Sequence, residues 1–402
     1  MNTAKSADPE PDGIATPAQL VSIVILNWNK AELTLDCIRL VREHTREINY
    51  EIVVIDNGST ADEFHLLTRQ LPPEVRLISL RENLYFGEAN NIGVEAATGD
   101  YVLFLNNDVQ VTAGYLTPLL RAFAENYSVG GVGSKFLYPD GSLQEAGAFV
   151  LEDGNTFQQG KFGMEVSERF NQGCQIVDYC SAACLLVRRD AFLAICGFDP
   201  LYDPAYFEDV DLSFRLRSNG LYTYYCSESV VYHLENMTSL AVWSRQEVGA
   251  VAAANHERFY QRWKGYLAER LVRDIEPPPL REVKPVARAI DAALLPKLLL
   301  CTSGRMEISD ECRDMLVLAE TLGSHYDIEF AAREMCSMSR IRSLCRHYGI
   351  GLHGDRVHRF APENLNGYQR VVLFGDLGVD SAVGTALHRA SDAGLVEQLL
   401  GH

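Results

Sequence analysis

The sequence predicts an α/β protein with a mainly parallel sheet, followed by a second, smaller α/β unit. Short apolar runs alternate with amphipathic helical patterns, and this alternation indicates βαβ units whose strands lie parallel. The clearest strand is residues 101–105, an apolar run that lies between Gly-Asp and the polar triplet Asn106-Asn107-Asp108. The alternation restarts near Lys297, after a Pro-rich stretch at 276–280, which predicts the second unit.

The composition indicates a globular protein that does not bind nucleic acid. The chain has 402 residues, of which 47% are hydrophobic and 22% charged, enough for two domains. With a net charge of −18, the chain lacks the excess of basic residues that is typical of a nucleic-acid binder. The ten cysteines form no Cys-x-x-Cys pair. Even the closest group, Cys174, Cys180 and Cys184, lies in apolar sequence, which favours buried free thiols in a reducing cytosol over a zinc site.

The chain shows no targeting or membrane-spanning segment. Residues 1–18 are polar, acidic and Pro-rich, which is typical of a disordered tail and unlike a signal peptide. No apolar run approaches the roughly 20 residues that a membrane span requires. We therefore expect a cytoplasmic protein that is soluble or peripheral to the membrane.

The predicted first domain, residues 19–272, begins with a regular alternation and then changes character. Strands are expected at 21–26, 51–55, 75–79 and 101–105, and helices at 31–44, 88–97 and 114–126. Beyond them, shorter strands are expected at 129–138, 147–151, 182–187, 221–225 and 230–232. Residues 154–173 are Gly- and Gln-rich and indicate a mobile loop. Two further helices are expected at 207–218 and 242–271.

The remainder of the chain divides into a linker and the second unit. Residues 273–296 read as a linker with an amphipathic helix at 286–295, which either lies on the protein surface or rests on an anionic membrane face. Residues 297–402 are expected to form the small α/β unit. Its strands are predicted at 298–301, 326–331 and 370–374, and its helices at 311–322 and 335–348. No catalytic constellation is evident in it.

Polar clusters follow several of the predicted strands in the first domain. They are Asn27-Trp28-Asn29, Asp56, Asn106 to Asp108, the helix start Glu208-Asp209 with Asp211, and His233. Each cluster alone is compatible with a structural role such as helix capping. Because the carboxyl ends of parallel strands meet at one sheet edge, where α/β proteins bind ligands, the whole set predicts a functional site.

The order of these motifs resembles glycosyltransferase family 2, which has the GT-A nucleotide-diphospho-sugar transferase fold. The matching segments are Val-Ser-Ile-Val-Ile-Leu-Asn-Trp-Asn (21–29), Ile-Val-Val-Ile-Asp-Asn-Gly-Ser (52–59), Glu-Asn-Leu-Tyr-Phe-Gly-Glu-Ala-Asn-Asn-Ile-Gly (82–93), Gly-Asp-Tyr-Val-Leu-Phe-Leu-Asn-Asn-Asp (99–108), Phe-Glu-Asp-Val-Asp-Leu (207–212) and Asn-His-Glu-Arg-Phe-Tyr-Gln-Arg-Trp (255–263). The chain is most similar in character to rhamnosyltransferase-like bacterial members that build surface polysaccharides.

This resemblance implies a nucleotide-diphosphate sugar as donor and a saccharide or lipid-linked saccharide as acceptor. The donor would be UDP- or dTDP-linked, with dTDP-rhamnose as one candidate. Asp56 would accept the N3–H of the uracil or thymine ring, a charge-assisted bond that specifies a pyrimidine. The other residues of the nucleotide-sugar site would be Asn27, Trp28, Asn29, Asn83, Asn91 and Asn107.

The resemblance also implies a divalent metal and a catalytic base. Asp108, with Asn106 or Asn107 and His233, would hold Mg²⁺ or Mn²⁺, which acts as a Lewis acid for the nucleotide leaving group. Many family members carry two aspartates in this motif, and here Asn106 replaces one of them. Since an amide oxygen still coordinates a hard cation, we interpret the variant motif as active.

The carboxylates at 208–211 would act on the acceptor. Asp209 resembles the family's base, which takes the proton of the acceptor hydroxyl as that oxygen attacks the anomeric carbon. A single displacement at that carbon inverts its configuration. Glu208 and Asp211 would position the acceptor or support Asp209.

Two rival interpretations remain open. A sugar nucleotidyltransferase would need a Gly-rich, basic loop after the first strand, where this chain has Asn-Trp-Asn-Lys (27–30). A catalytically inactive nucleotide-sugar-binding scaffold, partnering another transferase, is motivated by Asn106 and by the appended unit, whereas the intact Glu208-Asp209 pair argues against it. The second unit itself is compatible with an interaction module or with a remnant resembling half of a GT-B enzyme.

Overall fold

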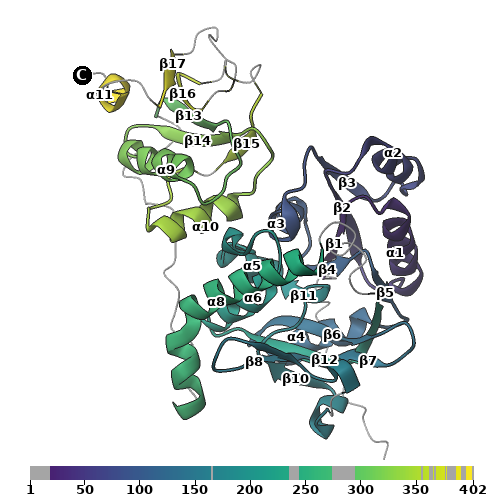
Figure 1. Ribbon diagram of the computed structural model, residues 1–402. Helices are drawn as coiled ribbons and strands as arrows, with labels where there is room; N and C mark the ends of the chain where they lie inside the picture. Colours follow the sequence, from purple (N-terminus) through teal and green to yellow (C-terminus); the bar gives the residue numbers. More distant parts are fainter. Residues whose placement is uncertain are drawn as a thin grey trace, which may run out of the picture.

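Two sheets organise the described part of the chain (Figure 1). The computed structural model describes residues 19–163, 166–234, 244–273, 295–354, 356–361, 365, 368–375, 377, 386–390 and 395–400. The predicted tail at 1–18 lies outside these residues, as does the predicted linker helix apart from its last position.

The larger sheet contains most of the strands. Its order is β10-β12-β6-β11-β4-β1-β2-β3, with β5 beside β12 and β7 beside β6. The strands are β1 Val21–Asn27, β2 Tyr50–Asn57, β3 Arg76–Leu80, β4 Tyr101–Asn106, β5 Val109–Val111, β6 Val129–Leu137, β7 Leu143–Glu145, β10 Cys174–Val177, β11 Cys184–Arg188 and β12 Tyr222–His233. The run β3-β2-β1-β4 is parallel, and β11 joins β4 antiparallel. The short strands β8 Ala148–Val150 and β9 Thr156–Gln158 form a separate pair.

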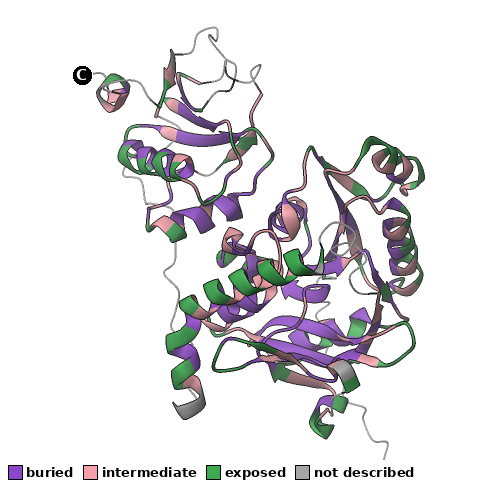
Figure 2. Ribbon diagram, in the orientation of Figure 1, coloured by how far each residue is buried: buried purple, intermediate pink, exposed green. Residues whose placement is uncertain are grey.

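Helices cover both faces of this sheet, and alternation along the strands explains how. In β1, Ile23 and Ile25 face the cluster containing α1 and α4, whereas Val24 faces the cluster containing α3, α5 and α6. The strands between the helices are accordingly buried (Figure 2). The helices are α1 Ala31–His44, α2 Ala61–Gln70, α3 Tyr85–Ala96, α4 Leu116–Glu125, α5 Arg189–Ala194 and α6 Glu208–Arg217.

A long helix, α8 Arg245–Arg273, packs its apolar side against α6. Phe214 of α6 meets Phe259 and Trp263 of α8 through edge-on ring contacts. These ring contacts hold α6 and α8 against each other.

The second unit is a small all-parallel sheet with its own core. Its strand order is β15-β14-β13-β16-β17, with β13 at the centre. The elements are β13 Lys297–Thr302, α9 Asp310–Leu322, β14 Asp327–Ala332, α10 Met338–Tyr348, β15 Val357–Arg359, β16 Arg370–Phe374, β17 Ala386–Arg389 and α11 Leu395–Leu400.

The predicted architecture, a mainly parallel mixed sheet flanked by helices and followed by a small α/β unit, is confirmed, and the differences are local. The two strands expected at 221–225 and 230–232 are one strand, β12, whose register shifts between Cys226 and Val230 around a polar Ser-Glu-Ser insert. The expected loop at 154–173 contains β9 and two short 3₁₀ turns at Lys161–Gly163 and Glu168–Asn171. Among the described helices, none is long and apolar enough to cross a membrane.

Candidate active site

The strand registers bring the predicted polar clusters to one edge of the large sheet. Asn27 at the end of β1 lies beside Asp56 of β2, and Leu26 lies beside Asn106 of β4. His233, the last residue of β12, pairs with Val109, next to Asp108. Residues from distant parts of the chain therefore converge where the parallel strands end, as the sequence predicted.

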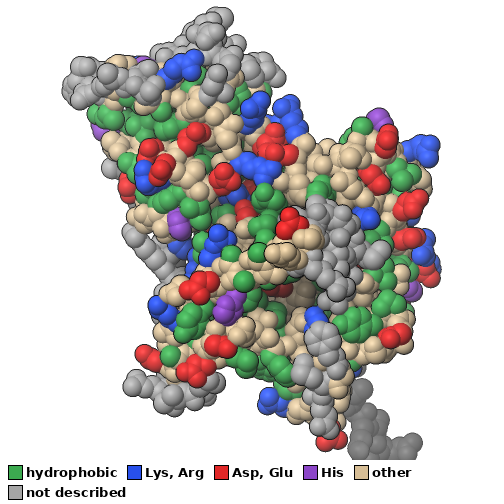
Figure 3. Space-filling model, in the orientation of Figure 1, with side chains coloured by type: hydrophobic (Ala, Val, Ile, Leu, Met, Phe, Trp, Pro, Cys, Tyr) green, Lys and Arg blue, Asp and Glu red, His purple; other side chains and the backbone are tan. Residues whose placement is uncertain are grey.

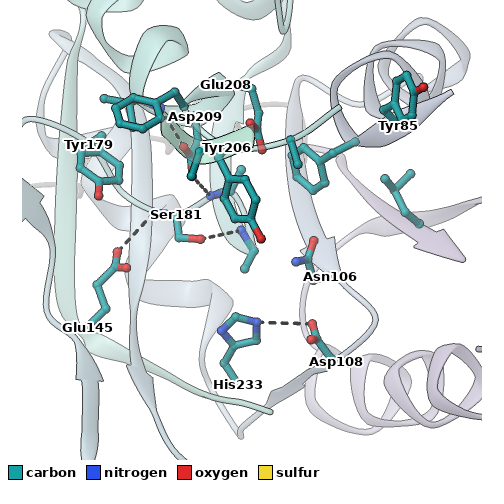
Figure 4. Close-up of a pocket in the computed structure, with 18 of the residues that line it drawn as sticks. Tyr85, Asn106, Asp108, Glu145, Tyr179, Ser181, Tyr206, Glu208, Asp209 and His233 are labelled. Carbon is teal, nitrogen blue, oxygen red and sulfur yellow. Dashed lines mark hydrogen bonds and ion pairs between the residues drawn. The ribbon is translucent and has the colours of Figure 1, made fainter. Parts of the chain in front are cut away.

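A cavity of about 520 Å³ opens at this edge (Figure 4). Its volume lies within the usual range for small-molecule sites. The predicted residues that line it are Trp28, Asn83, Asn106, Asn107, Asp108, Glu208, Asp209 and His233. Sequence reasoning missed other lining residues, among them Asn57, Tyr85, Phe86, Gln144, Glu145, Tyr179, Ser181 and Tyr206.

One end of the cavity suits a divalent cation. His233 Nε2 lies 3.4 Å from Asp108 Oδ1, and the other ring nitrogen lies 3.0 Å from Gln144 Oε1. The Asp108 Oδ1 atom is buried and accepts no hydrogen bond from the described residues. Carboxylate and amide oxygens with an imidazole are a donor set that Mg²⁺ or Mn²⁺ accepts, so the residues present fit the predicted metal.

The two asparagines of the triplet are placed differently. Asn106 projects into the cavity near Asp108 (Figure 4). Asn107 donates its side-chain amide to Thr34 Oγ1 on α1 at 2.9 Å. Because that bond ties Asn107 to α1, Asn106 is the better placed of the two to complete a metal site.

The opposite end of the cavity holds the carboxylates of α6. Asp209 accepts hydrogen bonds from the backbone N–H groups of Ala182 at 3.2 Å and Val210 at 2.8 Å. Burial raises the pKa of Asp209, and these two N–H groups oppose the rise. Burial and the neighbouring charge of Asp209 raise the pKa of Glu208 well above its usual range. The two backbone N–H groups therefore favour the ionised form of Asp209, which a general base requires.

A third carboxylate, Glu145, was not predicted from the sequence. Its Oε1 accepts from Ser181 N–H at 3.2 Å, and its Oε2 accepts from Gln158 Nε2 at 2.6 Å. Since Ser181 and Ala182 are consecutive, one turn holds both Glu145 and Asp209. Burial raises the pKa of Glu145 to about 7, although the Ser181 N–H opposes it. Glu145 lies on β7, which has only three residues and therefore shows no apolar alternation from which a strand could be predicted.

The loop before α6 has a strained backbone at the cavity wall. Tyr206 and Phe207 have φ values of 75° and 72°, a left-handed conformation that bulky side chains rarely adopt. Asn255 of α8 donates its amide to the carbonyls of Tyr202 and Ala205, both at 2.7 Å, and of Tyr206 at 3.1 Å. Asn255 thus holds this strained segment of the cavity wall against α8.

Some predicted nucleotide-binding residues brace the edge and do not line the cavity. Asn27 Nδ2 donates to Asp56 Oδ1 at 2.8 Å, and both side chains are buried. Asn29 accepts from Thr60 N–H at 2.8 Å. Asn91 donates to Phe198 O at 3.0 Å and accepts from Phe198 N–H at 2.8 Å, so its amide fixes the chain behind the cavity.

Asp211 also lies outside the cavity lining, which favours support of Asp209, the second of its two predicted roles, over contact with the acceptor. It is fully buried and accepts from Arg215 at 2.6 Å, from Arg262 at 2.9 Å and from Trp263 Nε1 at 2.9 Å. These contacts join α6 to α8. Asp211 therefore supports Asp209 by fixing the helix on which both residues lie.

Comparison with known proteins decides the family. The model described as Glycosyl transferase family 2 matches residues 22–195. N-acetylglucosaminyl-diphospho-decaprenol L-rhamnosyltransferase of Mycobacterium tuberculosis is 31% identical over 231 residues, which are 52% of this chain and 73% of that protein. The chain belongs to glycosyltransferase family 2. Its mixed sheet flanked by helices is the GT-A arrangement expected of a family 2 member.

Other similar proteins share smaller parts of their length with this family 2 chain. The O-antigen biosynthesis protein RfbC of Myxococcus xanthus is 28% identical over 226 residues, 55% of this chain, and the chain spans only 18% of that relative's length. A crystal structure of GalNAc-T7 with UDP, GalNAc and Mn²⁺ has a TM-score of 0.49 and 16% identity, covering 63% of this chain and 50% of that chain. The family match ends before α6, so the roles of Asp209 and His233 rest on the geometry described above.

Proposed function

We propose that this family 2 chain is an inverting glycosyltransferase that moves a sugar from a nucleotide-diphosphate sugar to a hydroxyl group of a saccharide or lipid-linked saccharide. The observation that carries the proposal is that one cavity joins the Asp108–His233 pair to the Asp209 carboxylate. A UDP- or dTDP-linked donor, with dTDP-rhamnose as the first candidate, and a role in cell-surface polysaccharide synthesis are suggested by the similar proteins from M. tuberculosis and M. xanthus.

In this proposal the donor lies along the sheet edge. Asp108, Asn106 and His233 would hold Mg²⁺ or Mn²⁺, which when bound supplies Lewis-acid stabilisation of the departing nucleotide diphosphate. Trp28 and Asn83 line the cavity and would border the nucleoside. Asp56 lies at the same sheet edge, outside the lining of the cavity; there it would accept the N3–H of the pyrimidine, with Asn27 holding its carboxylate in place.

The acceptor would enter at the end where the carboxylates gather. Asp209 takes the proton from the acceptor hydroxyl while that oxygen forms its bond to the anomeric carbon. The bond from that carbon to the diphosphate oxygen breaks in the same displacement, and the configuration inverts. Glu208 and Glu145 would flank the reacting hydroxyl, because Glu208 precedes Asp209 on α6 and Glu145 is held by the same turn as Asp209.

The test is turnover with defined donors. The purified chain is incubated with UDP- and dTDP-sugars, Mn²⁺ and simple saccharide or lipid-linked acceptors, and NMR follows the anomeric configuration of the product. We expect release of the nucleotide diphosphate and a product of inverted configuration. A product of retained configuration would contradict the single displacement.

The scaffold alternative is favoured by one observation, the amide of Asn106 at a position where many family members have a carboxylate. A scaffold would bind the nucleotide sugar and show no turnover with any donor or acceptor. Donor binding together with turnover therefore separates the enzyme from the scaffold.

A further inference from the structure

The second α/β unit docks on the first through the N-terminus of α10 (Figure 1). Ser337 precedes this helix and donates to Glu88 of α3 from its N–H at 2.8 Å and from its hydroxyl at 3.1 Å. The Ser339 N–H donates to Glu95 of α3 at 2.9 Å. Since N–H groups at a helix N-terminus lack partners within the helix and carry partial positive charge, carboxylates favour this position, and α10 is fixed against α3.

Arg340, on the first turn of α10, reaches the segment that leads to the catalytic carboxylates. Its side chain is only 7% exposed, and its Nη2 donates to Asp203 Oδ2 at 2.8 Å. Its Nε donates to the carbonyl of Met306. Its Nη1 lies 3.9 Å from Glu88 Oε2. Asp203 directly precedes residues 204–209, every one of which lines the cavity. Arg340 of the second unit therefore binds the start of the segment that forms this wall of the cavity.

Arg305, in the loop after β13, reaches the opposite wall. It donates to Glu82 Oε1 and to the carbonyl of Asn83, both at 2.9 Å. Its guanidinium also lies 5.2 Å from the centre of the Tyr85 ring. Asn83 and Tyr85 line the cavity. Figure 3 shows acidic and basic side chains gathered where the second unit meets the first.

We propose that the second unit positions the active site of the first, with Arg340 holding residues 203–209 and Arg305 holding residues 82–85. The strained residues Tyr206 and Phe207 need restraint, and Asn255 supplies part of it from α8. Arg340 restrains the same segment from α10. Neither arginine lines the cavity, so both are positioning residues and neither is catalytic.

Hydrogen–deuterium exchange of the full chain tests the restraint without any substrate. In Arg340→Gln, and separately in Asp203→Asn, which leaves the second unit unaltered, we expect backbone amides of residues 205–209 to exchange about tenfold faster. Exchange in the strand Tyr50–Asn57 should not change. Arg313→Gln is the matched control, because Arg313 pairs only with exposed acidic residues of α9 among its ion-pair partners in the described chain. Unchanged exchange at 205–209 in both variants would overturn the proposal.

Steady-state kinetics distinguish the role of Arg340 from that of Arg305. This second test rests on the proposed function. We expect Arg340→Gln and Asp203→Asn each to lower kcat by about tenfold or more with little change in the donor KM, and the double variant to be no slower than either single one. Arg305→Gln should instead raise the donor KM by about fivefold. Additive losses in the double variant, or equal kinetics for Arg340→Gln and Arg305→Gln, would overturn the assignment. An inactive wild-type chain that still shows the exchange changes would refute the proposed function and leave the positioning role supported.

Discussion

Glu208 and Asp209 are neighbours in the chain, yet the fold gives them different environments. Backbone N–H groups support the ionised form of Asp209, whereas Glu208 Oε2 is buried and accepts no hydrogen bond from the described residues. A general base must be ionised before it accepts a proton. These environments support the proposal that Asp209 takes the proton, with Glu208 beside it as a hydrogen-bonding group.

The variant Asp209→Asn tests this assignment. An amide keeps the shape of the side chain but accepts no proton, so turnover should fall by about 10²- to 10⁴-fold while donor affinity stays unchanged. Steady-state kinetics and calorimetric titration of the donor measure the two quantities. Asp36→Asn, at an aspartate whose side chain is 68% exposed, is the control. A near-normal rate for Asp209→Asn would move the base elsewhere.

The raised pKa of Asp209 predicts how kcat depends on pH at the acid end of the range. Burial raises this pKa above its usual value, so the carboxylate forms only at higher pH than in an exposed aspartate. At saturating metal and donor, kcat should rise with pH through a midpoint above the ordinary aspartate value of about 4. A midpoint at or below that value would show that another group limits the rate.

Helices α6 and α8 hold the base in place through a buried ion cluster. Burial alone would raise the pKa of Asp211, but the positive charges of Arg262 and Arg215 outweigh it and hold the pKa well below its usual range. Asp211 thus fixes the start of α6, the helix that carries the proposed base Asp209. A helix that slipped here would displace Asp209 from the cavity.

The cluster predicts a pH-dependent stability. A depressed pKa means that Asp211 stabilises the fold above the ordinary aspartate pKa of about 4, and that this stabilisation is lost as the pH falls through the lower folded value. Asp211→Ala leaves Arg215 and Arg262 without this partner, so the free energy of unfolding should fall by about 3 kcal/mol at pH 7. The difference from wild type should shrink below pH 4, as denaturant titrations can show. A difference that stays constant down to pH 3 would contradict this account.

The sequence predicted the elements that depend on local pattern and missed those that depend on distant contacts. The strands of the parallel run are rich in apolar residues, and their predicted bounds lie within two residues of the observed ones at every end. The strand registers bring Asp108 and His233 together at the sheet edge, and their role as metal ligands stays a prediction. Glu145 was missed because β7 has only three residues. The sequence left two roles open for Asp211, because the partners that distinguish them lie on a helix about 50 residues away.

The two units meet at a buried carboxylate whose titration is measurable. Burial raises the pKa of Glu88 from an ordinary 4.5 to about 7, although Arg340 and the Ser337 N–H oppose the rise. A raised pKa means that the stabilisation is complete below pH 4.5 and is lost as the pH rises through about 7. The wild-type melting temperature should therefore fall between pH 5 and pH 8 by more than that of Glu88→Gln, whose amide oxygen can still accept from Ser337. Glu43→Gln, at a half-exposed glutamate of α1, is the control. Parallel pH profiles for wild type and Glu88→Gln would contradict the raised pKa.

The most direct test of the active-site account is calorimetric titration of the full chain with uridine diphosphate and thymidine diphosphate, each with and without Mn²⁺. The account predicts that one of these nucleotides binds only when Mn²⁺ is present, and that Asp108→Ala loses this metal dependence because Asp108 supplies the buried carboxylate oxygen that lies beside His233. The nucleotide that binds also identifies the class of donor. Absence of binding by either nucleotide to the folded chain, or an unchanged metal dependence in Asp108→Ala, would contradict the account.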